Sequence, residues 1–224
     1  AGKSITNRAV KNEQSYDEMA INVSRLLFHE LSHANDYFPK SFYYSQRLNL
    51  TKTYQKTARE RFLKKELESD KLPSQVTSQK LIHIGQVLYQ GKKATTEDSA
   101  LLAEEVIQEF KNDVASDDYA YSTSREDYAM IAEEALMLYY YETPRFLFVI
   151  KLPEANFVPP DDYVYQIAWG EKSRVLEPKI KLRAAIVVEN DLGKDVGKKI
   201  IEKLNQYSSV EIPANLTWKE IIKL

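Results

Sequence analysis

The sequence contains no cysteine, only three histidines, and no apolar run long enough to cross a bilayer. Without cysteine there are no disulfides and no thiolate ligands, so a zinc site would have to use histidine and carboxylate side chains. Neither sign of charge dominates: the formal net charge of −2 gives no reason to expect nucleic acid or an anionic membrane as a partner. We therefore expect no nucleic-acid partner and no membrane span.

The length of 224 residues and a hydrophobic fraction of 43% are those of an ordinary globular protein with one substantial core. We expect a mostly α protein with a minor β component. Residues 1–150 would form a helical catalytic core, and residues 151–224 an α/β extension packed on the same domain. The chain begins with polar residues and no methionine, so we expect a processed protein or a piece of a longer one. The absence of cysteine fits an exported protein, which is the location we expect.

The most informative stretch is His29-Glu30-Leu31-Ser32-His33, an H-E-x-x-H motif. On a helix, residues four apart lie on the same face, so His29 and His33 can bind one Zn²⁺ and leave room for a third ligand and a water molecule. Glu30 points to the side of this pair, where a carboxylate acts as general base without being a ligand. This pattern predicts a zinc site, although two histidines at this spacing also occur by chance.

A helix is expected around the motif, from a capping box at Ser15 and Glu18 to a stop at Pro39. Apolar residues recur along it at helical spacing, which predicts a buried stripe with the histidines at its edge. The stripe comprises Met19, Val23, Leu26, Leu27, Leu31 and Ala34.

A second helix is expected from Ser124 to about Glu142, with a capping box of Ser124 and Asp127. It carries three glutamates that compete for the role of third zinc ligand: Glu126, Glu133 and Glu134. Glu126 and Glu133 are close to two turns apart and share a face, whereas Glu134 is turned by roughly 100°. From the residues alone, the choice among the three stays open.

Elsewhere, periodicity and turn residues give a coarse outline of the chain. They predict helices over 51–65, 78–90, 95–110, 180–190, 196–207 and 218–222, a strand over 163–169, and over 146–152 either a buried strand or a helix extension. His83, the third histidine, is expected to be an ordinary, partly buried residue.

The two helices together resemble those of gluzincin metallopeptidases, in which two histidines and a later glutamate on a helix hold zinc. The similarity is to the anthrax lethal factor catalytic domain and its bacterial relatives. It rests on the stretch from His29 to Tyr37 and on Ser124-Arg125-Glu126-Asp127-Tyr128-Ala129. It covers only these two short stretches, and it implies a zincin-like catalytic domain.

Residue by residue, the resemblance makes His29 and His33 zinc ligands, Glu126 the third ligand and Glu30 the general base. Glu133 remains the alternative ligand. Tyr119 takes the place of the tyrosine that stabilises the oxyanion in this family, with Tyr121 as the alternative. Met130 stands where relatives often carry a glutamate.

Other classes of zinc peptidase fit the sequence less well. The metzincin pattern requires glycine at position 36 and histidine at position 39, where this chain has Asp36 and Pro39. Asp36 as a direct ligand would stand only three residues from His33. A hydrogen bond from Asp36 to a ligating imidazole is the easier arrangement.

The sequence thus predicts a zinc-dependent peptidase that acts on a peptide or protein substrate through Glu30. The alternative is a non-catalytic binding domain with the same fold. It would hold a protein partner on a surface rich in tyrosine, of which the chain has 15. Substrate preference and oligomeric state are beyond the sequence.

Overall fold

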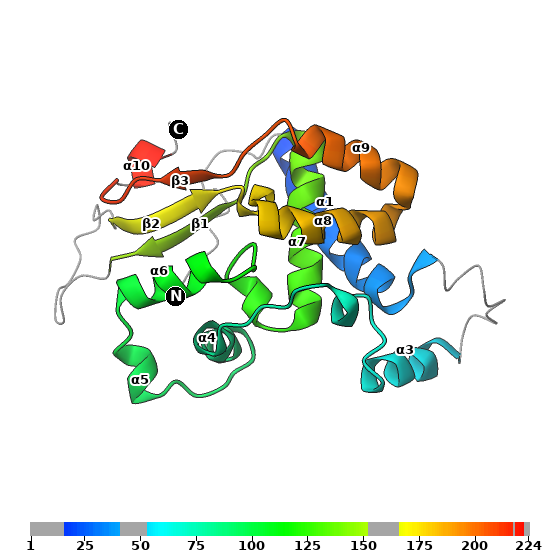
Figure 1. Ribbon diagram of the computed structural model, residues 1–224, viewed down its shortest axis with the longest axis horizontal. Coiled ribbons are helices and arrows are strands. Elements are labelled where there is room, and N and C mark those ends of the chain that lie inside the picture. Colours follow the sequence, from blue (N-terminus) through cyan, green and yellow to red (C-terminus); the bar gives the residue numbers. More distant parts are fainter. Residues whose placement is uncertain (1–15, 41–52, 152–165, 217, 222–224) are drawn as a thin grey trace.

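The computed structural model describes residues 16–40, 53–151, 166–216 and 218–221 (Figure 1). This part of the chain is mostly helical and carries one small antiparallel sheet in the order β1-β2-β3. The helices are α1 (Tyr16–Tyr37), α3 (Thr53–Leu63), α4 (Gln79–Tyr89), α5 (Thr96–Ser99), α6 (Ala103–Asn112), α7 (Ser124–Tyr141), α8 (Pro178–Leu192), α9 (Lys194–Leu204) and α10 (Trp218–Ile221). The strands are β1 (Phe146–Ile150), β2 (Ile167–Lys172) and β3 (Val210–Ile212). No helix within the described ranges is long and apolar enough to span a membrane.

Helix α7 lies at the centre of the molecule, with α1 along one side and α8 and α9 along another (Figure 1). Its middle is buried all round, from Asp127 to Leu138. Apolar residues of α7 pack with those of α8 and α9 into one cluster, which includes Ile131, Ala135, Val187 and Ile200. Residues on both sides of position 150 therefore share a single core.

The predicted orientation of α1 is wrong, although the predicted helix and its end before Pro39 are confirmed; the cap predicted at Ser15 lies outside the described residues. The apolar stripe is exposed: Val23, Leu26, Leu27 and Leu31 each keep half or more of their surface accessible. The opposite, polar face of the helix packs against α7 and α8. It does so because each polar group finds a partner there, which removes the cost of burying it. These contacts are Arg25 with Glu133, His29 with Glu126 and Glu133, and Ser32 with Asp191.

The first turn of α7 is capped by Thr123, not by Ser124 as predicted. The Thr123 hydroxyl accepts a hydrogen bond from the backbone N–H of Glu126 at 3.1 Å. The helix ends at Glu142, which adopts the left-handed conformation with φ of 52°, just before Pro144. The capping residue differs from the prediction by one position, so the helix boundaries agree closely with the expected ones.

Two buried contacts fix how this first turn faces its neighbours. The guanidinium of Arg183 on α8 donates hydrogen bonds to both carboxylate oxygens of Asp127, and both side chains are fully buried. The Tyr128 hydroxyl donates to Asp191 at 2.9 Å. Because these residues directly follow Glu126, they set the direction in which Glu126 points.

Asp127→Ala is expected to lower the free energy of unfolding by about 3–5 kcal/mol, because it leaves the Arg183 guanidinium buried without its counter-charge. Urea unfolding followed by circular dichroism would measure the loss. Glu202→Ala is the matched control: Glu202 pairs with Lys198 on the surface of α9, and its loss should cost about 1 kcal/mol or less. Equal losses in the two variants would contradict this account of the buried pair.

A second cluster joins the sheet to the helices on the other side of the molecule. Leu81 of α4, Phe110 of α6 and Trp169 of β2 pack there with Tyr121. The segment 146–152, for which two structures were predicted, contains strand β1. Strand β3 was not predicted, and the single helix expected over 95–110 is two helices, α5 and α6.

Candidate metal centre

Three side chains from two helices meet where α1 crosses the start of α7. His29 and His33 come from α1, and Glu126 comes from the first turn of α7. One ligand atom from each lies within 4.8 Å of the other two. Among the described residues, this is the one group of histidines and carboxylates so arranged that it could hold a metal ion.

The geometry suits a tetrahedral zinc ion. Oε2 of Glu126 lies 3.1 Å from Nε2 of His29 and 3.2 Å from Nε2 of His33. Ligand atoms bound to one tetrahedral zinc stand about 3.3–3.6 Å apart. Both distances from Glu126 agree within a few tenths of an ångström, and two imidazoles with one carboxylate are a donor set that zinc accepts. The three residues therefore fit the group that the sequence predicts.

Glu133 lies behind His29, on the side away from Glu126. Its Oε2 is 3.3 Å from Nδ1 of His29, while its Oε1 accepts hydrogen bonds from Arg25 at 3.0 Å and Arg145 at 2.9 Å. A carboxylate at Nδ1 fixes the imidazole so that Nε2 faces the metal. The structure thus places the alternative ligand Glu133 where it orients His29.

Without a metal, the cluster is a network of charges. Burial by itself lowers the pKa of His29, but hydrogen bonds to Glu126 and Glu133 outweigh it and raise that pKa to about 9. Burial disfavours the ionised form of Glu126, yet the two imidazoles hold its pKa down at about 2. Metal binding at neutral pH must therefore displace a proton from His29.

Glu30 and Tyr119, the predicted general base and oxyanion donor, lie close enough for the charge of Glu30 to act on the Tyr119 phenol. Glu30 is exposed, next to the exposed Leu26 and Leu27 of the same helix. The rings of Tyr119 and His29 are 6.1 Å apart between centroids. Burial, followed by the negative charges of Glu126 and Glu30, raises the pKa of Tyr119, so its phenol stays protonated and can donate. Tyr119 therefore lies beside His29 and Glu126, while Glu30 is exposed next to His29 in the chain.

Tyr121, the alternative to Tyr119, lies elsewhere. It is 2% exposed and packs edge to face against Phe110 in the cluster beneath the sheet. Its backbone lies against α4 at Gly85, where a Cβ would stand 2.8 Å from the Tyr121 carbonyl. This close approach requires glycine, and it holds the short turn Tyr119–Tyr121 in place.

The remaining predicted residues also have definite places. Both carboxylate oxygens of Asp36 accept hydrogen bonds from Ser69, so Asp36 anchors the end of α1 to that segment and not to an imidazole. Glu134 is buried on another side of α7, 3.9 Å from Arg145, and does not reach the histidines. His83 is partly buried as expected and pairs with Asp98 at 2.9 Å.

Sequence reasoning missed the group that supports His29. Arg25 stands one turn before His29 on the same face of α1, and Arg145 follows α7 directly. Together they hold the Glu133 carboxylate. Burial acts to raise the pKa of Glu133, but His29 and the two arginines outweigh it and lower that pKa. The one feature of the sequence that pointed to this support was that Glu126 and Glu133 share a face of α7.

Comparisons of the chain with protein-family models, with curated proteins and with solved structures gave no match. Only the residues of the candidate centre therefore bear on function.

Proposed function

We propose that this protein is a zinc-dependent peptidase with a zincin-like catalytic domain of the gluzincin type. The observation that carries the proposal is the meeting of His29 and His33 with Glu126, a residue on a distant helix. His29 and His33 are neighbours because they lie four residues apart on one helix. Glu126 lies 93 residues beyond His33, so only the tertiary fold brings its carboxylate to them. The expected zinc would be held by these three residues.

Bound there, zinc would lower the pKa of a water molecule and polarise the substrate carbonyl. Glu30 would accept the proton of the attacking water and deliver it to the leaving amine. The Tyr119 hydroxyl would donate a hydrogen bond to the oxygen that becomes negatively charged. Glu133 would keep His29 in the orientation that presents Nε2.

The surface around Glu30 supports a peptide as the substrate. Glu30 is exposed on the same face of α1 as Val23, Leu26 and Leu27. An extended peptide can approach the centre from this side and place apolar side chains on these residues. An exported location, which the sequence suggests, belongs to the same proposal.

The alternative is a binding domain that holds a protein partner on tyrosines without catalysis. Tyr140 is 54% exposed and Tyr141 is 37% exposed, next to each other at the end of α7. A catalytic protein needs Glu30 and a metal, whereas such a binding domain needs neither.

Elemental analysis and proteolysis separate the two functions. The purified protein is expected to contain about one zinc per chain. It should cleave unfolded casein, stop when the metal is removed with 1,10-phenanthroline, and recover when zinc is restored. A protein that holds no zinc after incubation with zinc, or one that holds zinc and cleaves none of a broad peptide library, would contradict the proposal.

A further inference from the structure

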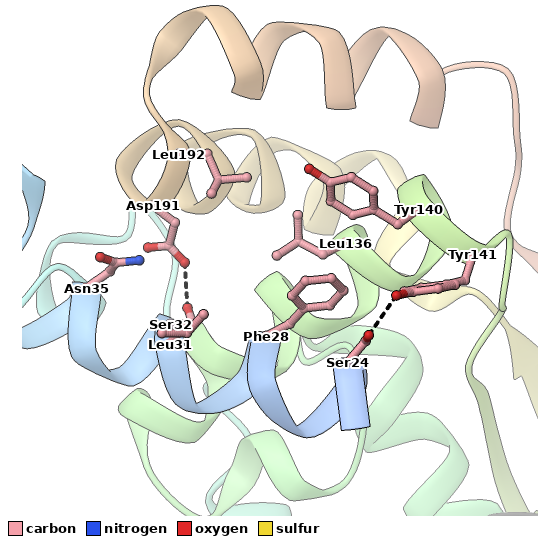
Figure 2. A pocket seen from close by; sticks show the side chains of 10 residues that line it. All are labelled: Ser24, Phe28, Leu31, Ser32, Asn35, Leu136, Tyr140, Tyr141, Asp191 and Leu192. Atoms are coloured by element: carbon pink, nitrogen blue, oxygen red, sulfur yellow. Dashed lines mark hydrogen bonds between the residues drawn. The ribbon is translucent and has the colours of Figure 1, made fainter. Parts of the chain in front are cut away.

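A groove of about 380 Å³ lies between α1, α7 and α8 (Figure 2). Phe28, Leu31, Leu136, Tyr140 and Leu192 form most of its wall. Figure 2 shows Asp191, Ser32 and Asn35 together at one end, and the hydrogen-bonded pair of Ser24 and Tyr141 at the other. A mostly apolar hollow of this size with a few polar groups at its ends is typical of a small-molecule site.

The groove is separate from the candidate metal centre. It opens on a different side of α1, because successive residues of a helix turn by about 100°: Phe28 and Ser32 line the groove, while His29 and His33 face Glu126. None of the three predicted metal ligands lines it. The proposed peptidase activity therefore leaves this groove without a role.

Asp191 contributes an acidic side chain to the lining of the groove. Its carboxylate accepts hydrogen bonds from Ser32 at 2.7 Å and from Tyr128 at 2.9 Å. Within the described part of the chain, no lysine or arginine forms an ion pair with it, and the negative charges of Asp36 and Glu68 act on it. Burial raises the pKa of Asp191 to about 7, and these two acids add to the effect. The Asp191 carboxylate thus has two neutral donors, faces an apolar hollow and has no cationic partner among the residues that the structure describes.

We propose that the groove binds a small organic cation with an apolar body that ends in an ammonium group. The ammonium would lie against Asp191 and beside the Asn35 side chain, and the apolar body would lie between Phe28, Leu136 and Tyr140. We take a free small molecule as the occupant, because the volume of the groove suits a ligand of drug size or smaller and its apolar wall ends in a few polar groups.

The test compares three ligands of one shape by isothermal titration calorimetry on the full chain at about pH 8, where Asp191 is mostly ionised. The ligands are 2-phenylethylamine, the neutral 2-phenylethanol and the anionic 3-phenylpropanoate. The amine is expected to bind at least about tenfold more tightly than the alcohol, and the anion to bind least. Equal affinities for amine and alcohol, or no measurable binding of the amine, would overturn the proposal.

Two variants, Asp191→Asn and Leu31→Arg, locate the site, and each has a matched control. Asp191→Asn should remove the preference for the amine, while Asp195→Asn, the same change at an exposed position on α9, should retain it. Leu31→Arg places a positive charge at the groove without disturbing the core, because Leu31 is 51% exposed. It should weaken amine binding at least about tenfold, whereas Leu27→Arg, 50% exposed and outside the groove, should not. Should Asp191→Asn fail to fold, the comparison of Leu31→Arg with Leu27→Arg decides, and equal binding by these two would refute the site.

Discussion

A Glu30→Gln variant should bind zinc as well as the unchanged protein does, and hydrolyse peptide bonds about 10²- to 10⁴-fold more slowly. Glutamine has the shape of glutamate but cannot accept the proton from the attacking water. Glu30 is exposed, and no side-chain hydrogen bond or ion pair holds it within the described structure, so the fold should not change. Initial rates on casein and zinc content by elemental analysis would measure both effects.

Glu104→Gln is the control for this experiment. Glu104 is also exposed, on α6, and lies away from the centre, so its loss should leave the rate unchanged. A Glu30→Gln protein that retains zinc and full activity would remove Glu30 from the mechanism. Loss of zinc from Glu30→Gln would instead show that Glu30 is a ligand.

Glu126→Gln and Glu133→Gln are expected to differ sharply in zinc affinity. Glu126 brings its oxygen to both imidazoles, so its neutral replacement should lose the metal during dialysis. Of the two histidines, Glu133 contacts only His29, at Nδ1, and loss of such a partner typically costs about 10- to 100-fold in metal affinity. Competition with a chromogenic chelator would give both dissociation constants.

The comparison tests the choice of third ligand directly. If Glu133→Gln lost the metal and Glu126→Gln kept it, Glu133 would be the third ligand. The imidazole of His29 would then bind the metal through Nδ1, the nitrogen that faces Glu133. Glu133 is buried between Arg25 and Arg145, so its replacement also disturbs two cations. Circular dichroism and urea unfolding of both variants would separate misfolding from a specific loss of zinc.

The orientation of α1 shows where a hydrophobic pattern misleads. The spacing of Val23, Leu27 and Leu31 predicts the helix correctly but places the wrong face inside. Periodicity measures only which residues are apolar. The buried face was decided by partners more than a hundred residues away, such as Glu133 for Arg25 and Asp191 for Ser32.

The position of Met130 gives a second example. In the resemblance to the lethal factor group, a glutamate at this position would support the site, and Met130 is instead buried in the core. Glu133, almost one turn further along α7, contacts His29. The resemblance matched residues position by position. Which residue contacts His29 depends instead on which side of α7 faces α1, and that side carries Glu133.

The sequence alone determined that α1 is a helix and that His29 and His33 share one face of it, because residues four apart on a helix are always neighbours. It also limited the main candidates for a third ligand to glutamates of a single later helix. The resemblance favoured Glu126, and only the tertiary structure showed that Glu126 meets both histidines while Glu133 lies at Nδ1 of His29. The rotation of α7 against α1 depends on distant contacts, above all Asp127 with Arg183 and Tyr128 with Asp191. No local rule specifies contacts between residues so far apart in the chain.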